Sequence, residues 1–202
     1  GSVSTDTIHL SNNYTMTIHT IFRLVTITIV VLNTAIGIIA YRRKTPLATS
    51  YCKIMFLSVG VVAAYSFSVT TDVYLSFSLW SSLYMVCVSW MLIELVLFTA
   101  EYTGFVNDSL KLFYRVLIAW GVIESVIFTI NPFTEITVTY EPINSPLVHF
   151  IYQRQALYVE HLIFNYICVA AILLMLIHKS IKVSKQYRKR FLFPAAGIVL
   201  IV

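Results

Sequence analysis

Two glutamates stand inside long apolar stretches of the sequence, where a carboxyl group is least expected. Glu94 interrupts the stretch from Trp80 to Gly104, and Glu124 interrupts the stretch from Lys111 to Ile130. A carboxyl group in apolar surroundings is costly to ionise. It either stays protonated and hydrogen-bonded between helices, or it changes its proton or its partner during function. The sequence leaves both alternatives open for both residues.

The spacing of the acids predicts how they are placed on their helices. Glu101 follows Glu94 by seven residues, so both point to one side of a helix, and Trp90 and Cys87 continue that face. Counted from the ends of the apolar runs, Glu94 and Glu124 differ in depth by about 10 Å. A direct contact between these two carboxyl groups therefore requires the helices to tilt or shift.

A second set of polar residues lies near the other ends of the apolar runs. Arg23 is three residues inside the first run, where it either snorkels to the membrane surface or binds a ligand. A mostly apolar cavity with a few charged groups suits a small polar or amphipathic ligand. We predict such a cavity, with Tyr65 and Trp80 as apolar walls and with polar residues from three runs: Arg23, Glu124, Glu160, His161 and Asn165.

The composition identifies the elements that must position these residues. Hydrophobic residues make up 58% and charged residues 11% of the chain, with a mean hydropathy of +0.82, whereas soluble domains carry roughly 25% charged residues. The net charge of +5 arises beside apolar runs, since six of the fourteen basic residues lie between Lys179 and Arg190 and three more are residues 42–44. Such clusters contact lipid headgroups. We expect a lipid bilayer as partner and no nucleic acid.

Five apolar runs have the length of a membrane-spanning helix, about 20 residues. They cover residues 20–41, 53–71, 79–100, 111–130 and 157–178. A sixth begins at Phe191, and its twelve residues to Val202 reach only about 18 Å, so it is expected to continue beyond Val202. The fold class is an all-α membrane protein, a polytopic helix bundle with six spans visible and seven expected. Residues 20–202 form this domain, after an arm, residues 1–19, that starts with a Gly1-Ser2 tag scar.

The basic residues of the connections predict the orientation of the bundle. The first, third and fifth connections are rich in basic residues, whereas the N-terminal arm and the other connections together contain a single basic residue, Arg154. The positive-inside rule therefore places the N-terminus outside. The long connection at 131–156 then lies outside as well. Residues 134–140 alternate apolar and polar, residues 142–146 form a turn and residues 147–152 resemble a second strand, which predicts an extracellular β-hairpin packed over the helix ends.

Cysteine and histidine spacing points to no metal site and no cofactor. The cysteines lie singly in or beside apolar runs, and four of the histidines are scattered: Cys52, Cys87 and Cys168, and His9, His19, His149 and His178.

The order of several motifs resembles one known family. Residues 98–104 read FTAEYTG at the end of the third span, Asn131-Pro132 and the hairpin follow the fourth, and residues 184–190 read SKQYRKR after the fifth. This order, over residues 20–202, is similar to the N-terminal seven-transmembrane region of bacterial sensor histidine kinases, which is also found on diguanylate cyclases (GGDEF).

The resemblance implies a ligand-sensing input domain in the bacterial cytoplasmic membrane, without catalytic activity of its own. It implies an unknown small-molecule ligand from the extracellular side, a cytoplasmic output module in the same chain, and a homodimer. Glu94 and Glu101 are then predicted to relay the signal. The alternative is a small polytopic transporter or channel with the intramembrane acids as ion or proton sites, although no matched pair of Gly- or Pro-broken helices is present.

Overall fold

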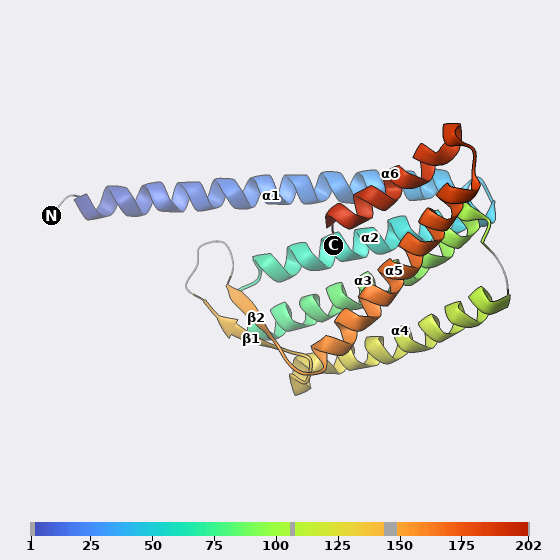
Figure 1. The fold of residues 1–202 in the computed structure, drawn as a ribbon. Coiled ribbons are helices and arrows are strands. Elements are labelled where there is room, and N and C mark those ends of the chain that lie inside the picture. The colour runs from blue at the N-terminus through green and yellow to red at the C-terminus, as the bar shows by residue number, and fades with distance from the viewer. Residues whose placement is uncertain (1–2, 106–107, 144–148, 202) are drawn as a thin grey trace.

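The computed structural model describes residues 3–105, 108–143 and 149–201, with side chains between residues 20 and 196 of these ranges. The described chain forms helices and one β-hairpin (Figure 1). The elements in order are α1 (Val3–Tyr41), α2 (Pro46–Thr70), α3 (Tyr74–Thr103), α4 (Asp108–Thr134), β1 (Val138–Pro142), β2 (Phe150–Arg154), α5 (Tyr158–Lys182) and α6 (Lys185–Ile201).

Among the residues that the structure describes, five helical segments are long and apolar enough to cross a membrane, in agreement with the five predicted spans. They are Thr20–Tyr41 of α1 and the whole of α2, α3, α4 and α5. The sixth run forms α6, which starts at Lys185, before the predicted Phe191, so that the basic residues 185–190 belong to the helix. Residues 3–19 continue α1 as helix.

Local capping explains where α2 begins and where α3 ends. Thr45 caps α2, since its hydroxyl accepts a hydrogen bond from the Ala48 amide at 3.2 Å, and Pro46 fits the first turn. The helix therefore begins seven residues before the predicted start at Lys53. α3 ends at Gly104, whose φ of 69° is left-handed and whose amide donates to the Glu101 carbonyl at 3.2 Å. Part of the motif at residues 98–104 is thus a helix terminus.

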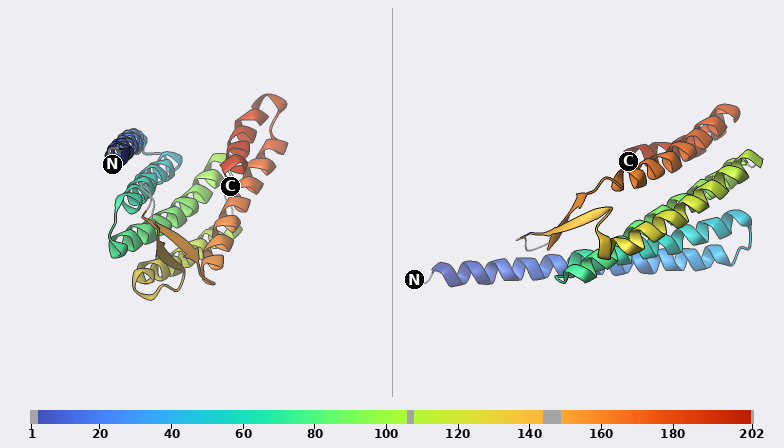
Figure 2. Two further views of the ribbon diagram at one scale, coloured as in Figure 1. Left: turned by 90° about the vertical axis from the view of Figure 1, so that its left-hand side faces the viewer. Right: turned by 90° about the horizontal axis from the view of Figure 1, so that it is seen from below.

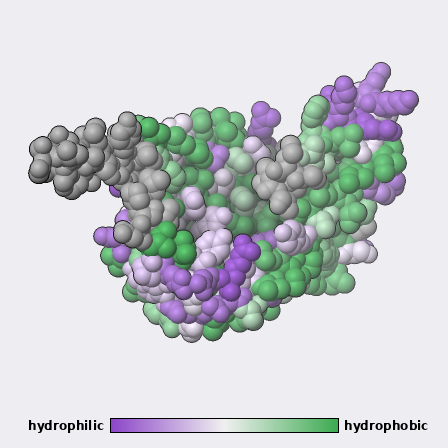
Figure 3. Space-filling view, turned by 60° about the vertical axis from the view of Figure 1, so that its left-hand side comes forward, coloured by the Kyte–Doolittle hydropathy of each residue, from purple (hydrophilic) through white to green (hydrophobic). Residues whose placement is uncertain are grey.

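α3 lies at the centre of the bundle and packs against α2, α4 and α5, while α1 packs against α2 and α6 against α5. Figure 2 shows α1 and α6 at the periphery. Large apolar side chains of α1 are exposed, among them Leu24 at 60% and Val31 at 59%. In Figure 3 hydrophobic residues cover much of the side of the bundle and hydrophilic residues gather toward its ends. This surface suits a bilayer.

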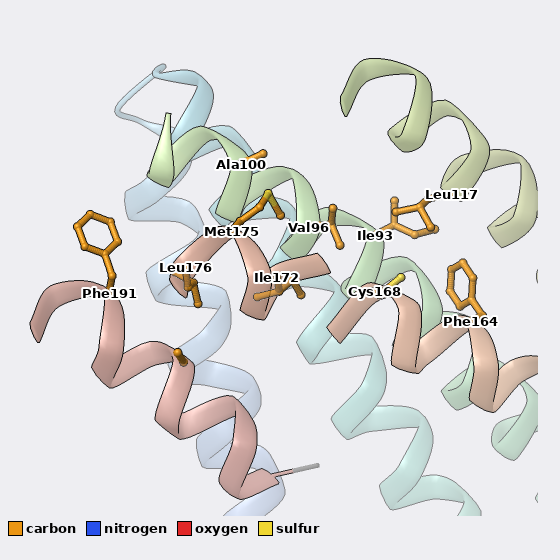
Figure 4. Close-up of a cluster of buried hydrophobic side chains, with 11 residues drawn as sticks. Ile93, Val96, Ala100, Leu117, Phe164, Cys168, Ile172, Met175, Leu176 and Phe191 are labelled. Atoms are coloured by element: carbon orange, nitrogen blue, oxygen red, sulfur yellow. The ribbon is translucent and has the colours of Figure 1, made fainter. Parts of the chain in front are cut away.

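The main core joins α3, α4, α5 and α6 (Figure 4). α5 contributes a continuous stripe and α3 faces it with three buried residues. The buried members are Ile93, Val96, Ala100, Leu117, Phe164, Cys168, Ile172, Met175, Leu176, Phe191 and Ala195.

Gly121 allows α4 to approach α3 closely. A Cβ atom at this position would lie 2.5 Å from Cδ1 of the fully buried Ile93. We expect Gly121→Ala to lower the free energy of unfolding by about 1–3 kcal/mol through overpacking. Ile93→Val, which removes that Cδ1, is expected to destabilise the native chain by about 0.5–1.5 kcal/mol and yet to stabilise the Gly121→Ala variant. Chemical denaturation in bicelles measures all four proteins, and a shift of the same sign in both backgrounds contradicts the close packing.

The predicted hairpin is present, with its first strand placed later than expected. β1 and β2 are antiparallel, and Tyr140 lies opposite Tyr152. The predicted strand start at Thr134 and the predicted helix end at Ile130 are wrong, because α4 continues to Thr134 and its last turn closes with the Glu135 amide donating to the Asn131 carbonyl at 2.8 Å. Residues 144–148, which hold most of the predicted turn, lie outside the described part.

The hairpin packs on the helix ends through a second apolar cluster, as predicted for a hairpin too small to be stable alone. Its buried members come from α3, α4, both strands and α5: Phe77, Phe128, Val138, Tyr140, Phe150 and Tyr158. We call this side of the molecule the hairpin end of the bundle.

Candidate functional site

A buried polar cluster connects the three central helices below the hairpin. It consists of Ser89 from α3, Glu124 from α4, and His161 and Asn165 from α5, and we call it the Glu124 cluster. His161 Nδ1 lies 3.2 Å from Glu124 Oε2, and Asn165 Nδ2 lies 2.9 Å from His161 Nε2. The Ser89 hydroxyl donates to the same Glu124 oxygen. Glu124 is 1% and His161 2% exposed, so bulk solvent does not screen these contacts.

The hydrogen bonds indicate which nitrogen of His161 carries the proton. Since the Asn165 amide nitrogen can only donate, His161 Nε2 accepts, and Nδ1 carries the hydrogen that it donates to Glu124. Glu124 Oε2 thus accepts from both His161 and Ser89. The other carboxyl oxygen, Oε1, is buried without a partner in the described part of the chain. A proton can therefore be added at Oε1 without displacing a hydrogen bond of the cluster.

Aromatic rings separate the Glu124 cluster from the hairpin. The Phe128 ring meets the His161 ring edge to face, with centroids 5.0 Å apart, and the Tyr158 ring lies 5.6 Å from it. Phe128 and Tyr158 also belong to the apolar cluster under the hairpin. Two packed rings therefore connect the hairpin with His161.

A second polar site lies further along α3, away from the hairpin. Lys53 of α2 forms an ion pair with Glu94 at 3.0 Å, and the Tyr114 hydroxyl of α4 donates to the same carboxyl oxygen at 3.4 Å. About two turns further along α3, Glu101 accepts a hydrogen bond from the Ser50 hydroxyl of α2 at 3.0 Å. Glu94 and Glu101 both contact α2, in agreement with the single face predicted from their spacing. Glu94 and Glu124 have separate partners, as their difference in depth suggests.

The remaining predicted residues occupy different places. Glu160 accepts a hydrogen bond from the Trp120 indole, and the Trp80 ring stacks on Phe67 with centroids 4.7 Å apart. Arg23 is exposed on α1. The structure thus brings together Glu124, His161 and Asn165 of the predicted cavity, whereas Arg23, Trp80 and Glu160 lie outside this cluster.

A hollow of about 400 Å³ lies between the hairpin and two helices, and we call it the hairpin hollow. Of the residues predicted for the cavity, it contains Tyr65. Its walls come from α2, α3 and both strands: Tyr65, Ser68, Val69, Phe77, Ser81, Tyr84, Met85, Val138, Tyr140, Phe150, Ile151 and Tyr152. Met85 joins the hollow to the Glu124 cluster, because the Ser89 hydroxyl shares its single hydrogen between Glu124 and the Met85 carbonyl, which lies 3.2 Å away.

Two candidate functional residues, Ser89 and Lys53, were not identified from the sequence. Ser89 resembles every other serine of an apolar run, and no spacing distinguishes it. Lys53 lies at the predicted start of its span, where a lysine is usually interpreted as an anchor at the membrane surface. The Thr45-Pro46 capping signal, which starts α2 earlier, was the feature that could have placed Lys53 inside the helix and opposite Glu94.

Comparison with known proteins identifies a family. The profile of a family described as the N-terminal 7TM region of histidine kinase matches residues 24–202, which is most of the chain. Comparison with curated proteins and with solved structures gives no significant match. The order of spans, hairpin and motifs agrees with the family assignment. The chain therefore belongs to the family of N-terminal seven-transmembrane regions of histidine kinases.

Proposed function

We propose that this domain is the ligand-sensing input part of a bacterial sensor kinase, with its N-terminus and hairpin outside the cytoplasmic membrane. The family supplies the membrane region of a histidine kinase. The basic connections support the orientation, since residues 42–44 and the six basic residues between Lys179 and Arg190 lie at the end of the bundle opposite the hairpin. The observation that carries the proposal is the Glu124 cluster, a buried polar connection among three helices directly below the hairpin.

The proposed mechanism follows from the sequence of contacts. A ligand that binds one arrangement of the hairpin more tightly shifts the population toward that arrangement. Phe128 and Tyr158 pass the shift to His161, and the polar cluster answers by changing a partner or a proton on Glu124. α3 then carries the change to Glu94 and Glu101, whose contacts with α2 lie further along the helix.

Output in this proposal occurs outside the domain. A seventh span would lead to a cytoplasmic kinase module in the same chain, and two chains would associate for phosphoryl transfer between them. A diguanylate cyclase module is the alternative output that the resemblance allows. The family assignment favours these readings over a transporter or channel, for which the buried acids would be ion or proton sites.

Replacing Glu94 tests the proposed relay in the full-length protein in nanodiscs. Glu94→Gln removes the charge that pairs with Lys53 but keeps the shape of the side chain. We expect a small change in stability, because half of the Lys53 side chain is exposed and such ion pairs contribute about 0–1 kcal/mol. We expect a change of about threefold or more in the basal autophosphorylation rate, equivalent to a shift of roughly 0.7 kcal/mol between the two states.

The matched control is Asp108→Asn, which breaks the exposed pair between Asp108 and Lys111 at 2.9 Å. This variant is expected to autophosphorylate like the native protein, because its ion pair does not connect two helices. Equal rates for Glu94→Gln, Asp108→Asn and the native protein would show that Glu94 takes no part in signal transmission.

A further inference from the structure

We propose that the hairpin hollow binds a small uncharged aromatic molecule that carries one or two hydrogen-bonding groups. The regulatory meaning of this binding rests on the proposed function, whereas the binding itself is a separate property of the hollow. The volume of about 400 Å³ falls within the range of about 300–1,000 Å³ that is usual for ligand pockets.

The walls of the hairpin hollow favour an aromatic ligand. Six of the twelve lining side chains are aromatic rings, and they are tilted against one another. The Tyr65 and Tyr84 centroids lie 5.8 Å apart at 49°, and the Phe77 ring lies 5.0 Å from both Tyr140 and Phe150. Rings at different angles offer both faces and edges, so a flat ligand can stack on one ring while its edge meets another.

Charge is missing from this lining, which favours an uncharged ligand. The twelve lining residues include no Asp, Glu, Lys, Arg or His. A charged ligand would lose its hydration in the hollow without gaining an ion pair, and that loss is large. Tyrosine rings attract cations. A cation in the hollow would nevertheless lack a carboxylate partner, because the nearby carboxylate of Glu135 already accepts a hydrogen bond from the Tyr74 hydroxyl and Glu141 is exposed.

Hydroxyl groups supply the polar contacts of the hollow. Ser68 and Ser81 stand on the two helix walls, and the tyrosines add hydroxyls from the helices and the strands. Burial raises the pKa of the Tyr140 hydroxyl, with the neighbouring serine hydroxyls acting in the opposite direction, so this group stays neutral at physiological pH. Such hydroxyls can donate to or accept from a carbonyl or hydroxyl group on a ligand.

Photolabelling with benzophenone tests the ligand class. This uncharged molecule has two rings and one carbonyl, and on illumination it reacts readily with methionine. Met85 lines the hollow, whereas Met175 is buried in the other core and Met55 lies on α2 outside the lining. Benzophenone is compared with an anionic analogue, 4-benzoylbenzoate, and a cationic analogue, (4-benzoylbenzyl)trimethylammonium. Mass spectrometry of the purified protein gives labelling at Met85 relative to Met55 and Met175, which corrects for partition into detergent.

We expect benzophenone to label Met85 preferentially, and both charged analogues to label it about tenfold less, because each loses hydration without an ion pair. Stronger labelling of Met85 by the cationic analogue would overturn the proposal in favour of a cation cage. Labelling of Met85 no stronger than that of Met55 by all three molecules would overturn the hollow as a site.

Filling the hollow supplies the variant control. Ser81→Phe places a ring inside the hollow and is expected to reduce Met85 labelling about tenfold. Leu83→Phe adds a ring on the same helix at a position that is 43% exposed and should label like the native protein. If Ser81→Phe does not fold, Ile151→Trp fills the hollow from the hairpin. Undiminished labelling in a folded filling variant overturns the proposal, and since this readout needs no kinase activity, it is independent of the proposed function.

Discussion

Replacing Glu124 with alanine is expected to lower the free energy of unfolding by about 2–4 kcal/mol, because the buried His161 Nδ1 loses its acceptor and an unpaired buried donor costs roughly 1–3 kcal/mol. The Ser89 hydroxyl also loses its bond to Glu124, but it can still donate to the Met85 carbonyl. Hydrogen bonds between membrane helices average only about 0.6 kcal/mol in mutant cycles. The larger value is expected here because alanine also leaves a space at a residue that is 1% exposed. Chemical denaturation in bicelles measures the change.

Two further variants separate the cluster from a general effect of losing an acid. Glu141→Ala removes an exposed carboxylate from β1 and is expected to change stability by less than about 0.5 kcal/mol. Combining Glu124→Ala with His161→Phe should give a coupling energy of about 0.5–3 kcal/mol, since the two side chains share a hydrogen bond. Native-like stability of Glu124→Ala, or strict additivity with His161→Phe, contradicts the cluster as described.

Asn131 fixes the hairpin to α4, and its replacement by alanine is expected to have an effect of similar size. Its Oδ1 accepts from the Thr137 amide at 2.9 Å, the Thr137 hydroxyl at 2.5 Å and the Val138 amide at 3.2 Å, while its Nδ2 donates to the Val138 carbonyl at 3.1 Å. All three residues are buried. Asn131→Ala is expected to lower the free energy of unfolding by about 2–4 kcal/mol, because it leaves buried backbone groups unpaired.

Hydrogen exchange tells local loosening of the hairpin from global unfolding. In Asn131→Ala the Thr137 and Val138 amides should exchange about tenfold faster or more, equivalent to roughly 1.4 kcal/mol of lost protection, while α3 keeps its protection. Thr134→Ala is the matched control, since its hydroxyl only returns to the Ile130 carbonyl of the same helix. Unchanged exchange in Asn131→Ala, or equal acceleration in Thr134→Ala, contradicts this role of Asn131.

The sequence was sufficient for the broad architecture because hydrophobicity is a property of long segments. Apolar runs of about 20 residues predict spans almost independently of their neighbours. Helix ends were harder to predict, since they depend on single contacts. Thr45 and Pro46 start α2 early, and Asn131 remains helical because its side chain is bound to the hairpin. An Asn-Pro pair alone suggests the end of a helix.

The sequence predicts how deep each residue of the candidate site lies along its helix, but not the direction in which that residue faces. Glu124, His161 and Asn165 meet because they lie at similar distances from the hairpin end and face one another. Arg23 was predicted for the same cavity, yet α1 packs against α2 at the edge of the bundle and leaves Arg23 exposed. The sequence gives no angle about a helix axis where the whole circumference is apolar. The hairpin hollow was harder still, because its walls combine helices with strands that are distant in sequence.

In the proposed function, the hairpin end of the bundle controls an output at the other end. The most direct test is the autophosphorylation rate of the full-length protein in nanodiscs, with Ser81→Phe compared with Leu83→Phe and the native protein. We expect a change of about threefold or more for Ser81→Phe, since filling the hollow biases one state, and no change for Leu83→Phe. A folded Ser81→Phe protein that autophosphorylates at the native rate would show that the hairpin end does not control the output.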